Sequence, residues 1–166
     1  GAGLAIGLYL YRTMTPRVAI LGRHPDGTLR DAKLHNLPAS EIVTAVRFDG
    51  RLYFANVAFF EDAILEAVAA NPKARWLLVV GEGINELDAS GEEVVRHLVE
   101  RLRSNGVNMV FSGLKKQVLD VMRATGLFEA IGERNFHITA DRALEAISAE
   151  IASQGIEGAF CLLPTK

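Results

Sequence analysis

Two hydrophobic periods alternate along the chain and predict the order of its strands and helices. The continuous apolar run at 76–80 is typical of a strand that a parallel sheet buries on both faces, and 107–111 is a further candidate for a buried strand. Apolar residues at helical spacing predict helices at about 57–70, 91–104, 114–125 and 141–153. Gly126 and Gly155 follow the last two as helix stops, and 136–138 is expected to form a short edge strand.

The earlier part of the pattern predicts a hairpin. Residues 42–48 are rich in β-branched side chains, Asp49-Gly50 follows as a turn signal, and a second apolar run begins at Leu52. The 12–40 stretch contains three prolines and is interpreted as a connector, within which the apolar run 18–21 would suit a strand. The resulting order predicts an α/β fold, with a mostly parallel or mixed central sheet of four to six strands and helices packed against it.

The N-terminal segment differs from the rest of the chain. Residues 1–11 carry no charge, and Arg12, Arg17 and Arg23 follow them. About 20 apolar residues are needed to cross a bilayer, so this stretch is too short to span one by itself. Two interpretations stay open: a first strand or helix of the folded domain, or the end of a transmembrane helix with arginines on its cytoplasmic side.

Composition and charge narrow the function classes. Of the 166 residues, 49% are hydrophobic and 23% are charged, as in an ordinary packed domain. The formal net charge is −2 with no basic stripe, so nucleic acid is not an expected partner. The single cysteine, Cys161, cannot form a disulfide within the chain, and the four histidines lack metal-ligand spacing. We therefore expect neither a bound metal nor another cofactor.

The 81–91 segment, GEGINELDASG, is the candidate functional loop. It follows the strand predicted at 76–80, and ligands and partners of open α/β sheets favour the crevice beyond the carboxyl ends of the strands. We expect Gly83, Ile84 and Asn85 to form a partner-contact loop. Asp88, Ala89 and Gly91 surround Ser90 at the start of the next predicted helix.

Ser90 has two interpretations. Ser90 and Glu93 fit a capping box, in which the serine hydroxyl accepts from the Glu93 amide and the glutamate reaches back. Alternatively, Ser90 is a phosphoacceptor or anion contact, since a helix N-terminus favours negative charge. The nearby acidic residues Asp88 and Glu92 would repel a phosphate, as a switch that disrupts an interface would require.

No catalytic or nucleotide-binding motif is complete. Gly81-x-Gly83 lacks the third glycine of a dinucleotide fingerprint, because Glu86 occupies that position, and no P-loop occurs. The nucleophile elbow of hydrolases is also missing around Ser90. We expect the protein not to be an enzyme, and nucleotide binding stays a minor alternative with the Gly91 helix start as its one phosphate cradle.

Three stretches resemble one known family. The D-x-S-G element at Asp88–Gly91 is similar to the signature of STAS domains, which occur in anti-sigma-factor antagonists and at the C-terminus of sulfate-permease-type (SulP) transporters. RFDGRLYFANV at 47–57 and RVAILGR at 17–23 resemble stretches of the transporter subgroup. In the antagonists the serine of this element is phosphorylated, and that position is Ser90 here. Ala89 departs from the family, since Ser or Thr is frequent in its place.

The resemblance implies a STAS fold and a regulatory, protein-interaction role in an anion transporter. Residues 1–12 would be the end of the last transmembrane helix, 13–40 a linker with an extra strand, 41–154 the STAS domain and 155–166 a C-terminal tail. The expected partners are the transmembrane domain of the same polypeptide, a second copy of the chain, or a cytosolic protein. The domain would lie on the cytoplasmic side of a bacterial inner membrane. The alternative is a free-standing anti-sigma-factor antagonist regulated by phosphorylation of Ser90.

Overall fold

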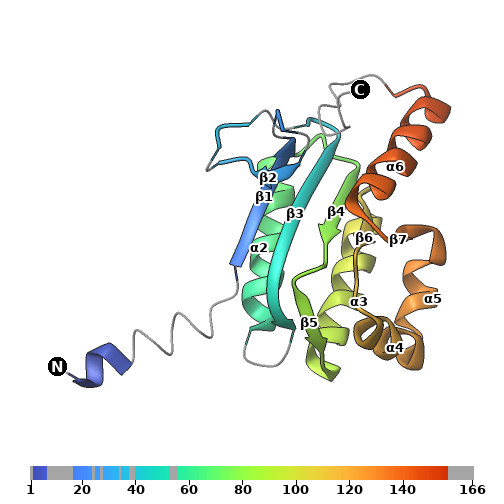
Figure 1. The fold of residues 1–166 in the computed structure, drawn as a ribbon. Coiled ribbons are helices and arrows are strands. Elements are labelled where there is room, and N and C mark those ends of the chain that lie inside the picture. The colour runs from blue at the N-terminus through green and yellow to red at the C-terminus, as the bar shows by residue number, and fades with distance from the viewer. Residues whose placement is uncertain are drawn as a thin grey trace.

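A mixed β-sheet with helices on both faces forms the body of the molecule (Figure 1). The computed structural model describes residues 2–6, 17–23, 25–26, 28–33, 35–37, 40–52 and 56–156. The strands are β1 (Arg17–Arg23), β2 (Leu29–Asp31), β3 (Val43–Leu52), β4 (Trp76–Val80), β5 (Ile84–Leu87), β6 (Asn108–Ser112) and β7 (Phe136–His137). The helices are α2 (Val57–Ala70), α3 (Ala89–Ser104), α4 (Lys116–Thr125), α5 (Leu127–Ile131) and α6 (Ala140–Gln154), with a 3-10 turn at Glu133–Asn135.

The sheet confirms the predicted α/β architecture. Six strands follow the order β2-β1-β3-β4-β6-β7, and β5 pairs with the end of β3 beside this path. β3, β4, β6 and β7 are parallel, whereas β1 is antiparallel to both β2 and β3. The run at 18–21, predicted to suit a strand, lies within β1.

Each face of the sheet has its own hydrophobic core. On one face, α2, α3, α4 and α5 cover alternate residues of the central strands, such as Leu77, Val79 and Phe111. On the other face, α6 and the β1–β2 end cover the residues between them, such as Leu78 and Val110. All five residues of β4 are buried, as expected for a central parallel strand.

The predicted hairpin around Asp49-Gly50 is wrong. These residues lie inside the single strand β3, which continues to Leu52. Residues 53 and 54 of the predicted second strand lie outside the described part of the chain. The chain continues through the turn signal because β3 pairs in parallel with β4 over 43–47 and with β5 at Gly50 and Leu52, with a register shift between these two residues. The antiparallel edge is formed instead by β1 and β2.

The helix boundaries largely match those predicted. Gly126 (φ 79°) and Gly155 (φ 65°) take the left-handed conformation that ends α4 and α6. The short helix α5 was not predicted, because five residues are too few for a periodic pattern. At the N-terminus, residues 2–6 are helical with Leu4 and Ile6 exposed. Residues 1 and 7–11 of the predicted apolar segment lie outside the described residues. Within the described residues, no helix is both long and apolar enough to cross a bilayer.

Candidate functional site

The 81–91 segment lies at the carboxyl edge of the sheet, where the parallel strands end together. The Gly81 amide donates to the Ser112 carbonyl oxygen at 2.8 Å, and the Gly113 amide donates to the His137 carbonyl oxygen at 3.0 Å. These two hydrogen bonds join the ends of β4, β6 and β7. The start of the 81–91 segment is therefore held in place by the hydrogen bond from Gly81 to the end of β6.

The segment is largely ordered into a turn and a strand. The Ile84 amide donates to the Gly81 carbonyl oxygen at 3.0 Å, and β5 follows directly. Ile84 and Leu87 are buried in the core, whereas Asn85 and Glu86 face outward. Of the three residues predicted as a partner-contact loop, Ile84 is 1% exposed and offers no side chain to a partner. Sequence reasoning missed β5 because a four-residue strand with two polar positions resembles a loop.

Gly83 lies against β3 at a distance that only glycine permits. A Cβ atom there would be 1.9 Å from the Asp49 Oδ1 atom and 2.9 Å from the Asp49 Cα atom. The carboxylate could turn away, but the Cα atom belongs to the β3 backbone. The missing side chain thus lets the turn before β5 pack directly on β3.

Asn85 is connected to the start of α4. Its Oδ1 atom accepts a hydrogen bond from Lys115 Nζ, and its carbonyl oxygen accepts one from Gln117 Nε2 at 3.3 Å. No local sequence pattern indicates these partners, which lie 30 and 32 positions further along the chain. They hold the exposed side of β5 against the neighbouring helix.

The N-cap of α3 is Asp88, so the predicted capping box of Ser90 and Glu93 is wrong. The Asp88 Oδ1 atom accepts from the Gly91 amide at 2.8 Å, and its carbonyl oxygen accepts from the Glu92 amide at 2.9 Å. Both Asp88 and Ser90 are good cap residues, but the helix begins two residues earlier than the serine cap required. An aspartate cap also brings negative charge to the positive end of the helix dipole.

Ser90 is therefore the second residue of α3, and it is half-buried. Its hydroxyl makes no hydrogen bond within the described residues. Of the acidic residues around it, Glu92 is held by Arg96, whose Nε atom lies 3.1 Å from Glu92 Oε1 and whose Nη2 atom donates to the Thr125 carbonyl oxygen at 2.9 Å. Glu93 is exposed.

This arrangement suits recognition by contact. The described part of the chain has no group of three or more His, Cys, Asp or Glu side chains able to hold a metal ion. The structure brings Gly83, Asn85, Asp88 and Ser90 into one short stretch at the carboxyl edge, with Ala89 exposed and Gly91 buried beside them. The exposed polar residues of the 81–91 segment are Glu82, Asn85, Glu86 and Asp88.

Comparison with known proteins places the chain in a family. A family model for the STAS domain matches residues 36–143. The chain is 26% identical over 158 residues to probable sulfate transporter 4.2 of Arabidopsis thaliana, covering 87% of this chain and 23% of the relative. It thus spans about a quarter of the length of that relative.

Solved structures share the fold. The murine solute carrier 26 family member A9 anion transporter superposes with a TM-score of 0.73 at 18% identity, over 88% of this chain and 24% of that chain. A SulP transporter STAS domain from Vibrio cholerae superposes with a TM-score of 0.58 at 19% identity, over 74% of this chain and 94% of that domain. An anti-sigma factor antagonist from Mycobacterium paratuberculosis superposes with a TM-score of 0.56 at 19% identity, over 80% of this chain and 95% of the antagonist. With a family model that matches most of its length, the chain belongs to the STAS domain family, and it is homologous to the STAS domains of SulP sulfate transporters.

Proposed function

We propose that this chain is the cytoplasmic regulatory domain of a sulfate-permease-type secondary anion transporter. The observation that carries the proposal is the match to about a quarter of a sulfate transporter's length, which leaves most of that relative for the transport machinery. In this proposal residues 1–12 end the last transmembrane helix, 13–40 link it to the domain, 41–154 form the domain and 155–166 are a tail. The domain changes transport through contacts and catalyses no reaction.

The carboxyl edge is the proposed contact surface. Asn85 is exposed on β5, Ser90 is half-buried at the start of α3, and the Gly83 turn lies between β3 and β5. The proposed partners are the membrane domain of the same polypeptide, a second copy of the chain or a cytosolic protein. A negative charge added at Ser90 would lie next to the Asp88 carboxylate and would change how this edge meets an acidic or basic partner.

The attachment to a membrane domain is tested by reading the gene upstream of the codon for Gly1. The proposal expects an open frame that encodes about ten or more apolar segments of about 20 residues each. A frame that starts within a few codons of Gly1 would sink the transporter assignment.

The regulatory role is tested in the full-length transporter with Ser90→Glu. We expect uptake of radiolabelled sulfate to change while the 166-residue chain keeps its circular dichroism spectrum. Ser104→Glu is the matched control, because Ser104 is an exposed serine at the other end of the same helix. Uptake that is the same in wild type and Ser90→Glu contradicts the switch.

A free-standing anti-sigma-factor antagonist is the second candidate. It is favoured by the likeness to the mycobacterial antagonist, 95% of which is covered, and by the unbonded Ser90 hydroxyl at a helix start. Incubation with ATP and a cognate kinase-type anti-sigma factor separates the two functions. The antagonist must be phosphorylated at Ser90, and Ser90→Ala must abolish the labelling.

A further inference from the structure

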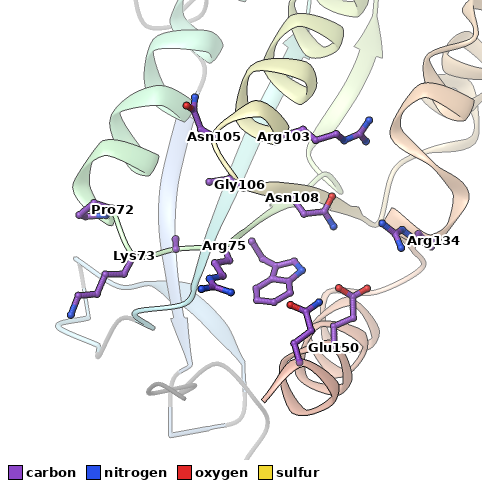
Figure 2. Close-up of a pocket in the computed structure, with 13 residues that line it drawn as sticks. Pro72, Lys73, Arg75, Arg103, Asn105, Gly106, Asn108, Arg134 and Glu150 are labelled. Carbon is purple, nitrogen blue, oxygen red and sulfur yellow. The ribbon is translucent and has the colours of Figure 1, made fainter. Parts of the chain in front are cut away.

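A cleft of about 860 Å³ opens at the amino edge of the sheet, opposite the 81–91 segment (Figure 2). It lies where β4 and β6 begin, between the ends of α3 and α6. The charged side chains that line it are Lys73, Arg75, Arg103, Arg134 and Glu150. Four cations and one carboxylate thus share one concave surface in a chain whose formal net charge is −2.

Helix C-termini explain part of this positive charge. α2 ends at Ala70, α3 at Ser104 and α6 at Gln154, and cations are favoured near the negative end of a helix dipole. Arg103 serves this role for α5, since its Nη1 and Nη2 atoms donate to the Ala130 and Ile131 carbonyl oxygens, each at 3.2 Å. Its guanidinium group is thereby held at the cleft.

Arg75 and Arg134 are different. Both are exposed, and within the described residues neither guanidinium group makes an ion pair or a hydrogen bond. They come from separate places in the chain, just before β4 and in the 3-10 turn before β7. Figure 2 shows both beside the cleft, with Glu150 on the α6 side and Lys73 directed away from Arg134. Two planar, fully charged donors are therefore available to a ligand.

The rest of the lining selects the class of ligand. Asn105, Asn108 and Gln154 contribute amides, whereas Trp76 and Val107 are almost fully buried and leave little apolar surface. An acidic peptide usually needs an apolar anchor, which this cleft lacks. Its volume falls in the range of about 300–1,000 Å³ typical of small-ligand sites. Guanidinium forks match phosphate and sulfate oxygens with paired hydrogen bonds.

We propose that this cleft binds a small polyanion carrying two or more phosphate or sulfate groups, contacted by Arg75 and Arg134 beside the fixed Arg103. The site is separate from the carboxyl edge and does not depend on the proposed transport role. It gives the domain a place to sense a soluble anion.

The test is isothermal titration of the 166-residue chain with sodium tripolyphosphate at constant low ionic strength. We expect saturable binding with one site per chain. Arg75→Gln with Arg134→Gln should weaken it by about a hundredfold, because the hydrogen bonds of each charged guanidinium group contribute about tenfold or more. The matched control, Arg101→Gln with Arg142→Gln, removes two exposed arginines outside the cleft and should leave the affinity unchanged. Equal weakening in both double variants, or no saturable binding, overturns the proposal.

A second measurement on the unsubstituted chain keeps the test independent of variant folding. Amide shifts on titration with tripolyphosphate should concentrate at Gly106, Asn108 and Arg134. Shifts that concentrate at Ser90 and Gly91 instead would assign the anion to the start of α3 and overturn the cleft.

Discussion

Replacing Asp88 by alanine tests the assignment of the α3 cap. The substitution removes the Oδ1 acceptor that lies 2.8 Å from the Gly91 amide, while α3 keeps its buried face of Val95, Leu98 and Leu102. Loss of an N-cap costs about 0.5–2 kcal/mol, typically about 1. Loss of the negative charge at the helix start adds about 0.3–1 kcal/mol. We therefore expect Asp88→Ala to lower the free energy of unfolding by about 1–2 kcal/mol.

Ser90→Ala is the matched comparison on the same turn. The Ser90 hydroxyl takes no part in the cap, so its removal should change the free energy of unfolding by less than about 0.5 kcal/mol. Asp88→Asn keeps an acceptor but loses the charge, and it should fall between the two.

Urea unfolding followed by far-UV circular dichroism at pH 7 measures all three variants. An unchanged slope with a shifted midpoint reports a change in stability directly. With a slope of about 1–3 kcal/mol/M, the Asp88→Ala midpoint should fall by about 0.3–2 M. A Ser90→Ala variant as unstable as Asp88→Ala would refute the reasoning, because it would make the serine the cap.

Three further substitutions probe other parts of the structure. Gly83→Ala should lower the free energy of unfolding by about 1–3 kcal/mol, measured by urea unfolding, because its Cβ would be 2.9 Å from the Asp49 Cα atom. Burial lowers the pKa of His137 below its ordinary value, although a hydrogen bond to the Arg134 backbone and the Glu150 charge oppose this. As the pH falls through about 6.5, His137 is protonated in the unfolded chain before it is protonated in the folded chain. The free energy of unfolding therefore declines as the pH falls towards the lower folded pKa. In urea unfolding at a series of pH values, His137→Gln should make this decline smaller between about pH 7 and 5. Asp141→Asn should lower the free energy of unfolding by about 1–2 kcal/mol, measured by thermal unfolding. The Arg23 side chain is 6% exposed, and its Nη2 atom lies 2.7 Å from Asp141 Oδ1. The Asp141 carboxylate is half exposed, so solvent weakens the ion pair.

The sequence pattern predicted those elements whose side chains repeat over many residues. β4 is a continuous apolar run and β6 is apolar at its three central residues. α3 and α6 show helical spacing with clear stops, so tertiary contacts only reinforce the local preference. These elements determine the α/β class without further information.

The errors arose where long-range pairing decided between local alternatives. Asp49-Gly50 is a favourable turn sequence, but β3 continues through it because β4 pairs with the strand before these two residues and β5 pairs with it from Gly50 onward. Asp88 and Ser90 are both good N-cap residues. Asp88 is the cap because β5 ends at Leu87, directly before it, and α3 begins at Ala89. No local signal joins Arg75 to Arg134, which are 59 positions apart and line one cleft only when the sheet forms.

The register of β1 has a mechanical consequence. Arg17, the first residue of β1, lies opposite Asp49 in the antiparallel ladder, and Asp49 touches Gly83 at the turn before β5. A force applied to the chain at Arg17 would therefore act on the sheet next to the 81–91 segment. Only Asp49 lies between Arg17 and the turn at Gly83. The point where the chain enters the sheet and the 81–91 segment therefore lie at the same edge, joined through Asp49 of β3.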